Sequence, residues 1–182
     1  MAWPQKVLRQ FQLVPPNSDE GAYCGPWNKL LYTLFPADSD FTVVPNFQEL
    51  GSTQGADFLI SIDVYIGNKP VLLVELKKPN NLRYISRRED ADMQLRRRLR
   101  DLVRDCPIPT MYGISAFGSR VCFYRLSTVP GSPINPPLIP RDLEYVNDVA
   151  PEDRWNDNVL DVGGEDKLRQ VVREIFDACS NL

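Results

Sequence analysis

The segment 71–77 combines a buried strand pattern with two charged residues whose spacing suits hydrolytic chemistry. Its four apolar residues, 71–74, predict a strand that continues through Glu75 and Lys77. Because side chains alternate along a strand, these two charges point to the same face. Opposite charges on an apolar strand cost desolvation energy unless they are used. Metal-assisted phosphodiester hydrolysis would use them, because the carboxylate would bind the ion and the lysine would orient water or stabilise the phosphorane charge.

Histidine is absent from the 182-residue sequence. Its absence excludes Ser-His-Asp and Cys-His catalysis and every mechanism with a histidine acid or base. Hydrolysis would therefore rest on carboxylates, lysine and an oxygen-bound ion such as Mg²⁺ or Mn²⁺. The four cysteines are scattered without a CxxC pair, which predicts free thiols and an intracellular protein. We expect neither a signal peptide nor a membrane span.

Basic residues are concentrated directly after this strand. Residues 77–104 contain ten Lys or Arg and four acidic residues, a local charge of +6 on a chain whose net charge is −3. The other residues have 11 basic and 20 acidic side chains. A basic region of this kind can bind phosphates even when the whole protein is acidic. The same charges are also consistent with a solvated helix face stabilised by ion pairs between successive turns.

The elements expected around this segment form one domain over residues 1–182. Residues 1–20 look irregular, and a helix is predicted within 18–35. A strand at 41–47 precedes an antiparallel hairpin at 57–78, and a helix covers 85–105. Two strands (111–116, 120–126), a Pro-rich extended segment (128–158) and a closing helix within 161–182 complete the chain. The resulting order, α-β-β-β-α-β-β-α, predicts an α/β sandwich with a mixed central sheet.

This order and its charged residues resemble the PD-(D/E)xK nuclease superfamily. The resemblance implies a restriction-endonuclease-like αβββαβ core over residues 20–126, extended by the Pro-rich segment and C-terminal helix. In that core an aspartate opens the second strand, as Asp57 does here, and the tripeptide on the third strand matches Glu75-Leu76-Lys77. Several branches also place a glutamine on the next helix, where this chain has Gln94, with a tyrosine one turn later, where it has Arg98. The chain also looks like uncharacterised single-domain fungal members.

The resemblance implies a role for each matching residue. Asp57 and Glu75, with the Leu76 carbonyl, would bind Mg²⁺ or Mn²⁺, Lys77 would activate water, and Gln94 would position water or phosphate. Nucleic acid, DNA more than RNA, would be the partner, and a homodimer is possible. The basic residues expected to hold its backbone are Lys78, Arg87, Arg88, Arg96, Arg97 and Arg100.

Several alternatives stay open at the level of sequence. A simple hairpin closed at 67–70 sets Glu75 opposite residue 62 and Asp57 near residue 80, so either a bulge brings Asp57 across or Asp63 is the second ligand. Glu20 would add a third carboxylate or complement a helix dipole. Glu75 and Lys77 could also be a structural ion pair. In that case the chain would be a non-catalytic module with a nuclease-like fold, or a partner of other proteins.

Overall fold

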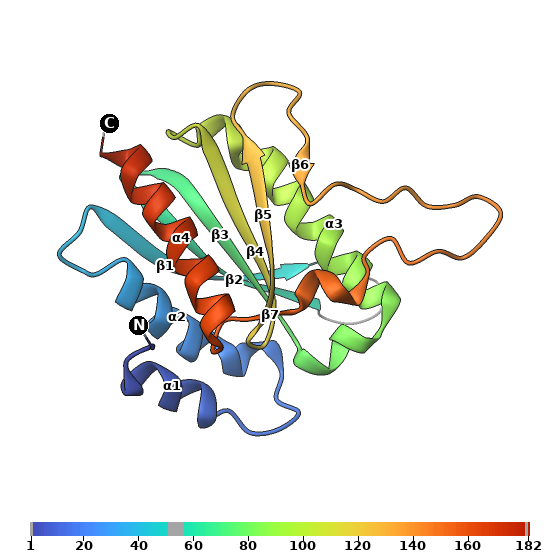
Figure 1. The fold of residues 1–182 in the computed structure, drawn as a ribbon, viewed down its shortest axis with the longest axis horizontal. Helices are drawn as coiled ribbons and strands as arrows, with labels where there is room; N and C mark the ends of the chain where they lie inside the picture. Colours follow the sequence, from blue (N-terminus) through green and yellow to red (C-terminus); the bar gives the residue numbers. More distant parts are fainter. Residues whose placement is uncertain (1, 51–56, 181) are drawn as a thin grey trace.

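The computed structural model describes residues 2–50, 57–180 and 182, and it has the α/β architecture that the sequence predicts (Figure 1). In the described residues seven strands form one sheet, with the order β1-β2-β3-β4-β5-β6 and with β7 paired to β5. The strands are β1 (Phe41–Leu50), β2 (Asp57–Ile66), β3 (Lys69–Lys77), β4 (Thr110–Phe117), β5 (Arg120–Ser127), β6 (Ile134–Asn135) and β7 (Asp157–Asn158). The α-helices are α1 (Gln5–Gln12), α2 (Cys24–Leu34), α3 (Ile85–Leu102) and α4 (Val162–Cys179), with short 3₁₀ turns at Glu20–Tyr23, Pro79–Arg83, Val103–Asp105 and Glu152–Trp155.

A β-bulge in the β2–β3 hairpin decides which face Glu75 occupies. Val64 pairs with Leu72 but Tyr65 pairs with Pro70, so one residue of β3 is extra and the register shifts. Ile66 pairs with Lys69, so the turn is only residues 67–68, and without the bulge Glu75 would lie opposite Ile60. With the bulge it lies opposite Ser61, whereas a hairpin closed at 67–70 would set it opposite residue 62. A one-residue shift exchanges the two faces of a strand, so the bulge moves Glu75 onto the face of β2 that carries Asp63.

The sheet is mixed because α3 carries the chain from β3 to a parallel neighbour, β4. All other neighbouring strands pair in antiparallel fashion. Gly118 turns the chain from β4 to β5 with φ near +67°, and a Cβ there would lie 2.9 Å from the Pro79 ring. Only glycine accepts both the left-handed conformation and this close approach without strain. The turn thereby fixes the end of β4 beside the end of β3.

Helices cover both faces of the sheet. Helices α1, α2 and α4 pack on one face through a core that includes Trp27, Leu31, Ile62 and Val172. Helix α3 packs on the opposite face, together with Trp155 from the C-terminal extension. In Figure 1 the red α4 and the green α3 lie on opposite sides of the central strands. Asp63, Glu75 and Lys77 project toward α3, so side chains of that helix contact them.

Most predicted elements are confirmed, with boundaries that differ by a few residues. The prediction of an irregular N-terminus is wrong, because α1 forms between Pro4 and the prolines at 15 and 16. Its apolar side chains Val7 and Phe11 are buried, and Phe11 meets Trp27 of α2 edge to face with 6.1 Å between ring centroids. An eight-residue helix is marginal alone, so this packing stabilises it.

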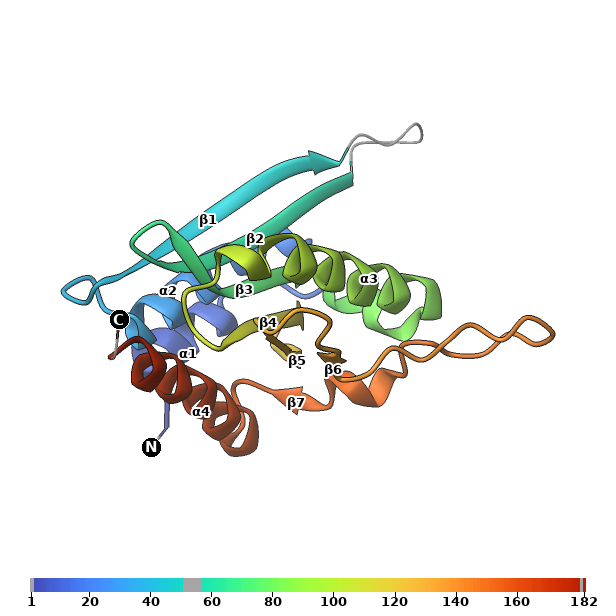
Figure 2. The same ribbon diagram turned by 90° about the horizontal axis from the view of Figure 1, so that it is seen from above.

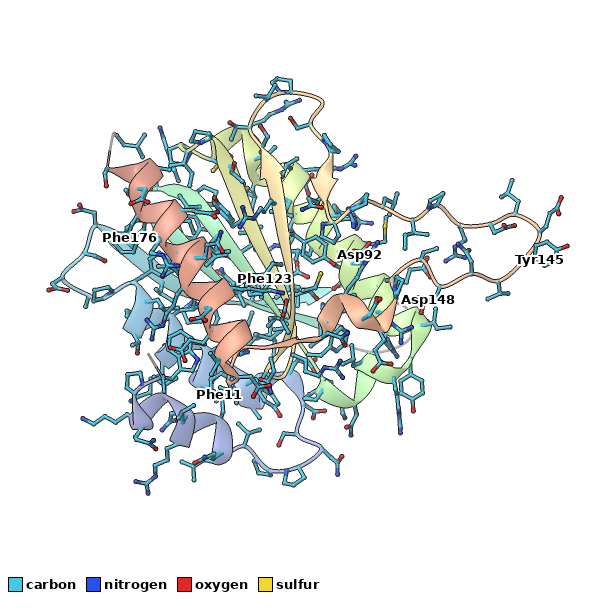
Figure 3. All side chains as sticks on the ribbon, in the orientation of Figure 1. Phe11, Asp92, Phe123, Tyr145, Asp148 and Phe176 are labelled. Atoms are coloured by element: carbon cyan, nitrogen blue, oxygen red, sulfur yellow. The ribbon has the colours of Figure 1, made fainter. Side chains whose placement is uncertain are left out.

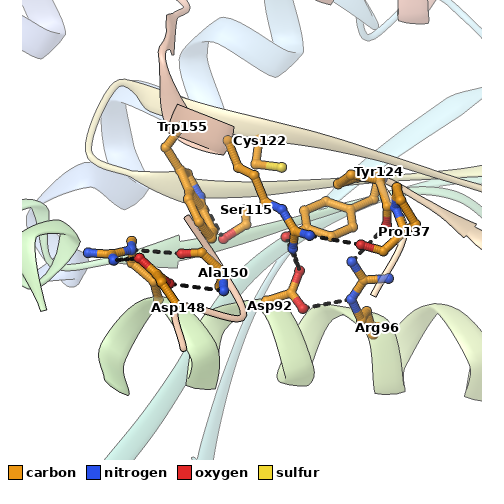
Figure 4. A network of polar contacts seen from close by, with 12 residues as sticks. Asp92, Arg96, Ser115, Cys122, Tyr124, Pro137, Asp148, Ala150 and Trp155 are labelled. Carbon is orange, nitrogen blue, oxygen red and sulfur yellow. Dashed lines mark hydrogen bonds and ion pairs between the residues drawn. The ribbon is translucent and has the colours of Figure 1, made fainter. Parts of the chain in front are cut away.

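The C-terminal extension is bound to α3 by a buried polar network (Figure 4). Asp92 accepts hydrogen bonds from Arg96 at 2.7 Å, from Arg154 at 3.1 Å and from the Tyr124 hydroxyl at 2.7 Å. The two arginines also donate to the carbonyls of Pro136 and Pro137. One carboxylate therefore joins α3, β5 and the segment that follows β6.

None of the helices in the described part of the chain has the length and apolar composition needed to cross a bilayer.

Candidate active site

The charged end of β3 brings Glu75, Lys77 and Gln94 together, as the sequence predicts. Glu75 is fully buried between Ser61 of β2 and Ser115 of β4. The Lys77 ammonium lies 3.9 Å from Glu75 Oε2. It also donates a short hydrogen bond to the side-chain oxygen of Gln94 on α3. A carboxylate, an ammonium and an amide from three places in the sequence thus meet at one point.

Asp63 belongs to the same cluster through Arg98. The Arg98 guanidinium lies 2.8 Å from Asp63 Oδ2 and 3.5 Å from Glu75 Oε1, so it links the two carboxylates. Asn46 Nδ2 donates to the same Asp63 oxygen at 2.9 Å, and the Tyr65 hydroxyl lies 3.4 Å from it. Arg98 therefore neutralises charges that would be costly to bury alone.

Two buried carboxylate oxygens remain without a hydrogen bond among the described residues. They are Asp63 Oδ1 and Glu75 Oε2, and the Ser61 hydroxyl beside them is also unsatisfied. Buried polar atoms normally have partners, so their absence calls for an ion, a water molecule or another group. Carboxylate oxygens are the ligands that Mg²⁺ and Mn²⁺ prefer, so the chemistry of these two side chains suits such an ion. The described residues contain no group of three or more His, Cys, Asp or Glu side chains that could hold one.

Burial raises the pKa of both carboxyls above their ordinary values. For Glu75 the charges of Lys77 and Arg98 oppose this rise, and for Asp63 the charge and hydrogen bond of Arg98 oppose it. A divalent ion would compete with the proton for the same oxygens, so metal affinity at this site should increase with pH.

Asp57 opens β2, where the sequence places it, but in a different part of the strand from this cluster. It pairs with Leu50 and lies four residues before Ser61, about 13 Å along a strand. The structure describes the backbone of Asp57 but not its side chain. Asp63 lies only two residues beyond Ser61. Of the two aspartates, Asp63 is the one whose described contacts reach the surroundings of Glu75.

Leu76 and Glu20 are the remaining predicted ligands. Leu76 lies in the paired part of β3, between Ile60 and Ala116. Glu20 is in the 3₁₀ turn before α2, where it adds to the effect of Asp19 in raising the pKa of Lys78. Lys78 itself forms a 2.7 Å ion pair with Asp19.

Two of the predicted nucleic-acid contacts are wrong. Arg88 is 3% exposed and pairs with Asp148 while donating to the Leu82 and Ala150 carbonyls. Arg96 is 5% exposed and pairs with Asp92. Both guanidinium groups are directed into the protein because their partners lie on α3, in the turn before it or in the C-terminal extension. Arg87, Arg97 and Arg100 are exposed on α3.

Sequence reasoning missed Arg98 as a member of the site. It noted Arg98 only as a departure from the tyrosine that the superfamily places one turn after the glutamine. The spacing itself was the signal, because residues four apart lie on one face of a helix. Because Gln94 faces Lys77 of β3, Arg98, one turn later on α3, faces Glu75 of β3 and Asp63 of β2.

A small pocket of about 290 Å³ opens beside the carboxylates, between β1, β2 and α3. Polar and aromatic side chains dominate its lining: Asn46, Phe47, Leu59, Ser61, Asp63, Tyr65, Arg98 and Leu102. Because Asp63 and Arg98 form part of its wall, this pocket gives a small ligand access to the cluster.

A scan against protein-family models and searches of curated proteins and solved structures found no match for this chain. By its fold and its site, the chain is an α/β protein with a mixed sheet and a buried cluster of two carboxylates, which is held by Arg98 and Lys77.

Proposed function

We propose that this protein is a metal-dependent nuclease that hydrolyses phosphodiester bonds. The observation that carries the proposal is the position of Lys77. Its ammonium is held by Gln94 beside the buried Glu75, whose Oε2 has no hydrogen-bond partner among the described residues. An ion-binding carboxylate and a fixed ammonium side by side are the groups that phosphodiester hydrolysis needs.

The order of the elements supports the same proposal. Helix α2, strands β1 to β3, helix α3 and strand β4 follow one another in the αβββαβ order that the resemblance implies. Glu75-Leu76-Lys77 ends the third of these strands, and Gln94 lies on the helix after it.

Glu75 and one aspartate would hold Mg²⁺ or Mn²⁺ at this site. Asp63 is favoured by its link to Glu75 through Arg98 and by its free Oδ1, while Asp57 is favoured by the resemblance. When bound, the ion would polarise the scissile phosphate and lower the pKa of a water molecule.

The side chains around that position would orient the reacting groups. Lys77 would stabilise the negative charge that develops on the phosphate oxygens in the transition state. Gln94 holds the Lys77 ammonium in place for this role. The Gln94 amide nitrogen would donate to phosphate or water, since its oxygen is occupied by Lys77. Exposed Arg87, Arg97 and Arg100 would bind the backbone of the nucleic acid through charge.

We expect the purified protein to cleave nucleic acid only with a divalent cation. Supercoiled plasmid, single-stranded DNA and RNA oligonucleotides would be incubated with Mg²⁺ or Mn²⁺, with and without EDTA. Cleavage should stop with the chelator and return when Mn²⁺ is added in excess. It should also weaken steeply between about 50 and 200 mM salt, because phosphate contacts release counterions. Cleavage that continues in EDTA would contradict a metal mechanism.

A second candidate is a non-catalytic binding module built on the same fold. Arg98 favours this candidate, because its guanidinium already links both carboxylates with a positive charge. A permanent internal counter-ion would leave no role for a metal and would make the cluster a structural one.

Calorimetry with Mn²⁺ separates the two candidates. If the protein is a nuclease, we expect wild-type protein to bind Mn²⁺, and Arg98→Met to bind it more tightly because a competing positive charge is gone. If it is a binding module, wild-type protein should give no binding heat. Arg98→Met should then only lose stability, by about 3 kcal/mol, because two buried carboxylates lose their partner.

A further inference from the structure

A long arm, residues 137–149, projects from the body of the protein beyond the first turns of α3 (Figures 1 and 2). Its tip, residues 142–146, presents three large apolar side chains to solvent. Leu143 is fully exposed at 100%, Val146 is 98% exposed and Tyr145 is 74% exposed. Tyr145 lies at the outer end of the arm in Figure 3. Apolar side chains gathered on one projection are typical of an interaction surface.

The tip has a shape that its own hydrogen bonds define. Asp142 Oδ1 accepts from the backbone N–H groups of Glu144 at 2.7 Å and Tyr145 at 3.1 Å. Asn147 joins the two limbs of the arm, because it accepts from the N–H of Asp142 and donates to the Pro140 carbonyl. A preformed tip loses less conformational entropy when it binds a partner.

Ion pairs fix the arm to α3 on both sides of its tip. Arg88 of α3 pairs with Asp148, and Arg141 pairs with Glu89. Arg154 donates to the Pro137 carbonyl at 2.8 Å. Figure 3 places Asp148 where the arm returns to the body. The arm therefore keeps its apolar tip out of the core, and the tip lines a pocket of about 560 Å³ together with the first turn of α3.

At the opposite end of α3 an apolar groove of about 710 Å³ separates the helix from the loop after β5. Its apolar part includes Val103, the exposed Val129 and the prolines 130 and 133. Arg100 and Arg104 also line the groove, and these two charged side chains are called its rim below. In the described part of the chain no carboxylate lies within ion-pair distance of either arginine, and the lining contains no acidic residue.

We propose that the tip of the arm binds in this groove of a second copy of the chain. Both surfaces are apolar, and their charges are opposite in sign. The tip offers Leu143, Tyr145 and Val146 to an apolar groove. It carries Asp142 and Glu144 beside them, opposite a rim with two unpaired arginines. Complementary charges of this kind select a partner and orient it.

The geometry of α3 excludes the groove of the same molecule. Glu89 contacts the arm directly before its tip and Arg104 lines the groove, so about 22 Å along α3 and the turn after it separates the two. The arm also points away from the body and not along α3 toward the groove. Two copies can each insert their arm into the other, which gives a closed dimer with two equivalent contacts.

Charge reversal on each side of the contact tests the proposal. Sedimentation velocity over a range of concentrations should show a monomer–dimer equilibrium for wild-type protein. Glu144→Arg and Arg104→Glu should each raise the dimer dissociation constant at least tenfold, since each places like charges in contact. An equimolar mixture of these two variants should dimerise again, because every tip then meets a rim of opposite charge. The double variant should also recover the wild-type affinity.

Asp38→Arg, which reverses an exposed charge in the turn before β1, is the matched control and should leave the equilibrium unchanged. Urea unfolding verifies that each variant folds, which is expected because both charges are exposed. A monomer at every concentration would overturn the proposal. So would a dimer whose affinity is unaffected by Glu144→Arg and Arg104→Glu.

Discussion

Glu75→Gln should reduce nucleic-acid cleavage at least about 10³-fold, because the proposed ion loses its central carboxylate. The contribution of a bound ion to transition-state stabilisation is several kcal/mol, and each 1.4 kcal/mol is a factor of ten in rate. Glutamine keeps the size of a fully buried side chain, so the packing between Ser61 and Ser115 is retained. Single-turnover cleavage of a labelled oligonucleotide with Mn²⁺ measures the rate.

Companion variants make this result specific to the site. Lys77→Met should lower the single-turnover rate about 10²- to 10³-fold, since it removes one group that stabilises developing charge. Asp101→Asn, an exposed carboxylate on α3, is the matched control and should leave the rate unchanged. Asp57→Asn and Asp63→Asn, measured side by side, identify the second ligand by which of them loses activity. Full activity of Glu75→Gln would contradict the nuclease proposal at this site.

The hairpin that carries the site was predictable from local pattern, but its register was not. Alternation and the turn at 67–70 identify β2 and β3, and they set Glu75 and Lys77 on one face. The register of the hairpin changes at a β-bulge between Val64 and Tyr65. No local sequence motif predicts this bulge, and the bulge changes which face of β2 lies on the same side of the sheet as Glu75. Asp57 and Asp63 both lie on that face, and Asp57 was the preferred ligand at the level of sequence because it opens the strand as in the superfamily.

The arginines of α3 illustrate a second limit. Charge spacing predicted a basic helix, and Arg87, Arg97 and Arg100 are indeed exposed. Arg88 is buried because Asp148, 60 residues further along the chain, returns to meet it. Contacts at such separation are set by tertiary structure and leave no local signature. The same holds for Arg154, whose partner Asp92 lies 62 residues earlier.

Asp92→Asn should lower the free energy of unfolding by about 3–5 kcal/mol, because it removes the single negative charge that two arginines share. Arg96 and Arg154 donate to this buried carboxylate, and both are largely removed from water. A buried ion pair adds little by itself, but removing one partner leaves an uncompensated charge at this cost. Urea unfolding at pH 7, followed by tryptophan fluorescence, measures the change.

The position of Asp92 also predicts which part of the molecule responds first. Arg96 and Arg154 hold the extension through the carbonyls of Pro136 and Pro137, so loss of their anchor should expose that segment. Limited proteolysis should then cut Asp92→Asn between residues 134 and 158 under conditions that leave wild-type protein intact. Asp90→Asn, an exposed neighbour on the same helix, should change stability by less than about 0.5 kcal/mol. A loss below about 1 kcal/mol in Asp92→Asn would show that the extension is held by its apolar contacts, with Trp155 foremost, and not by this carboxylate.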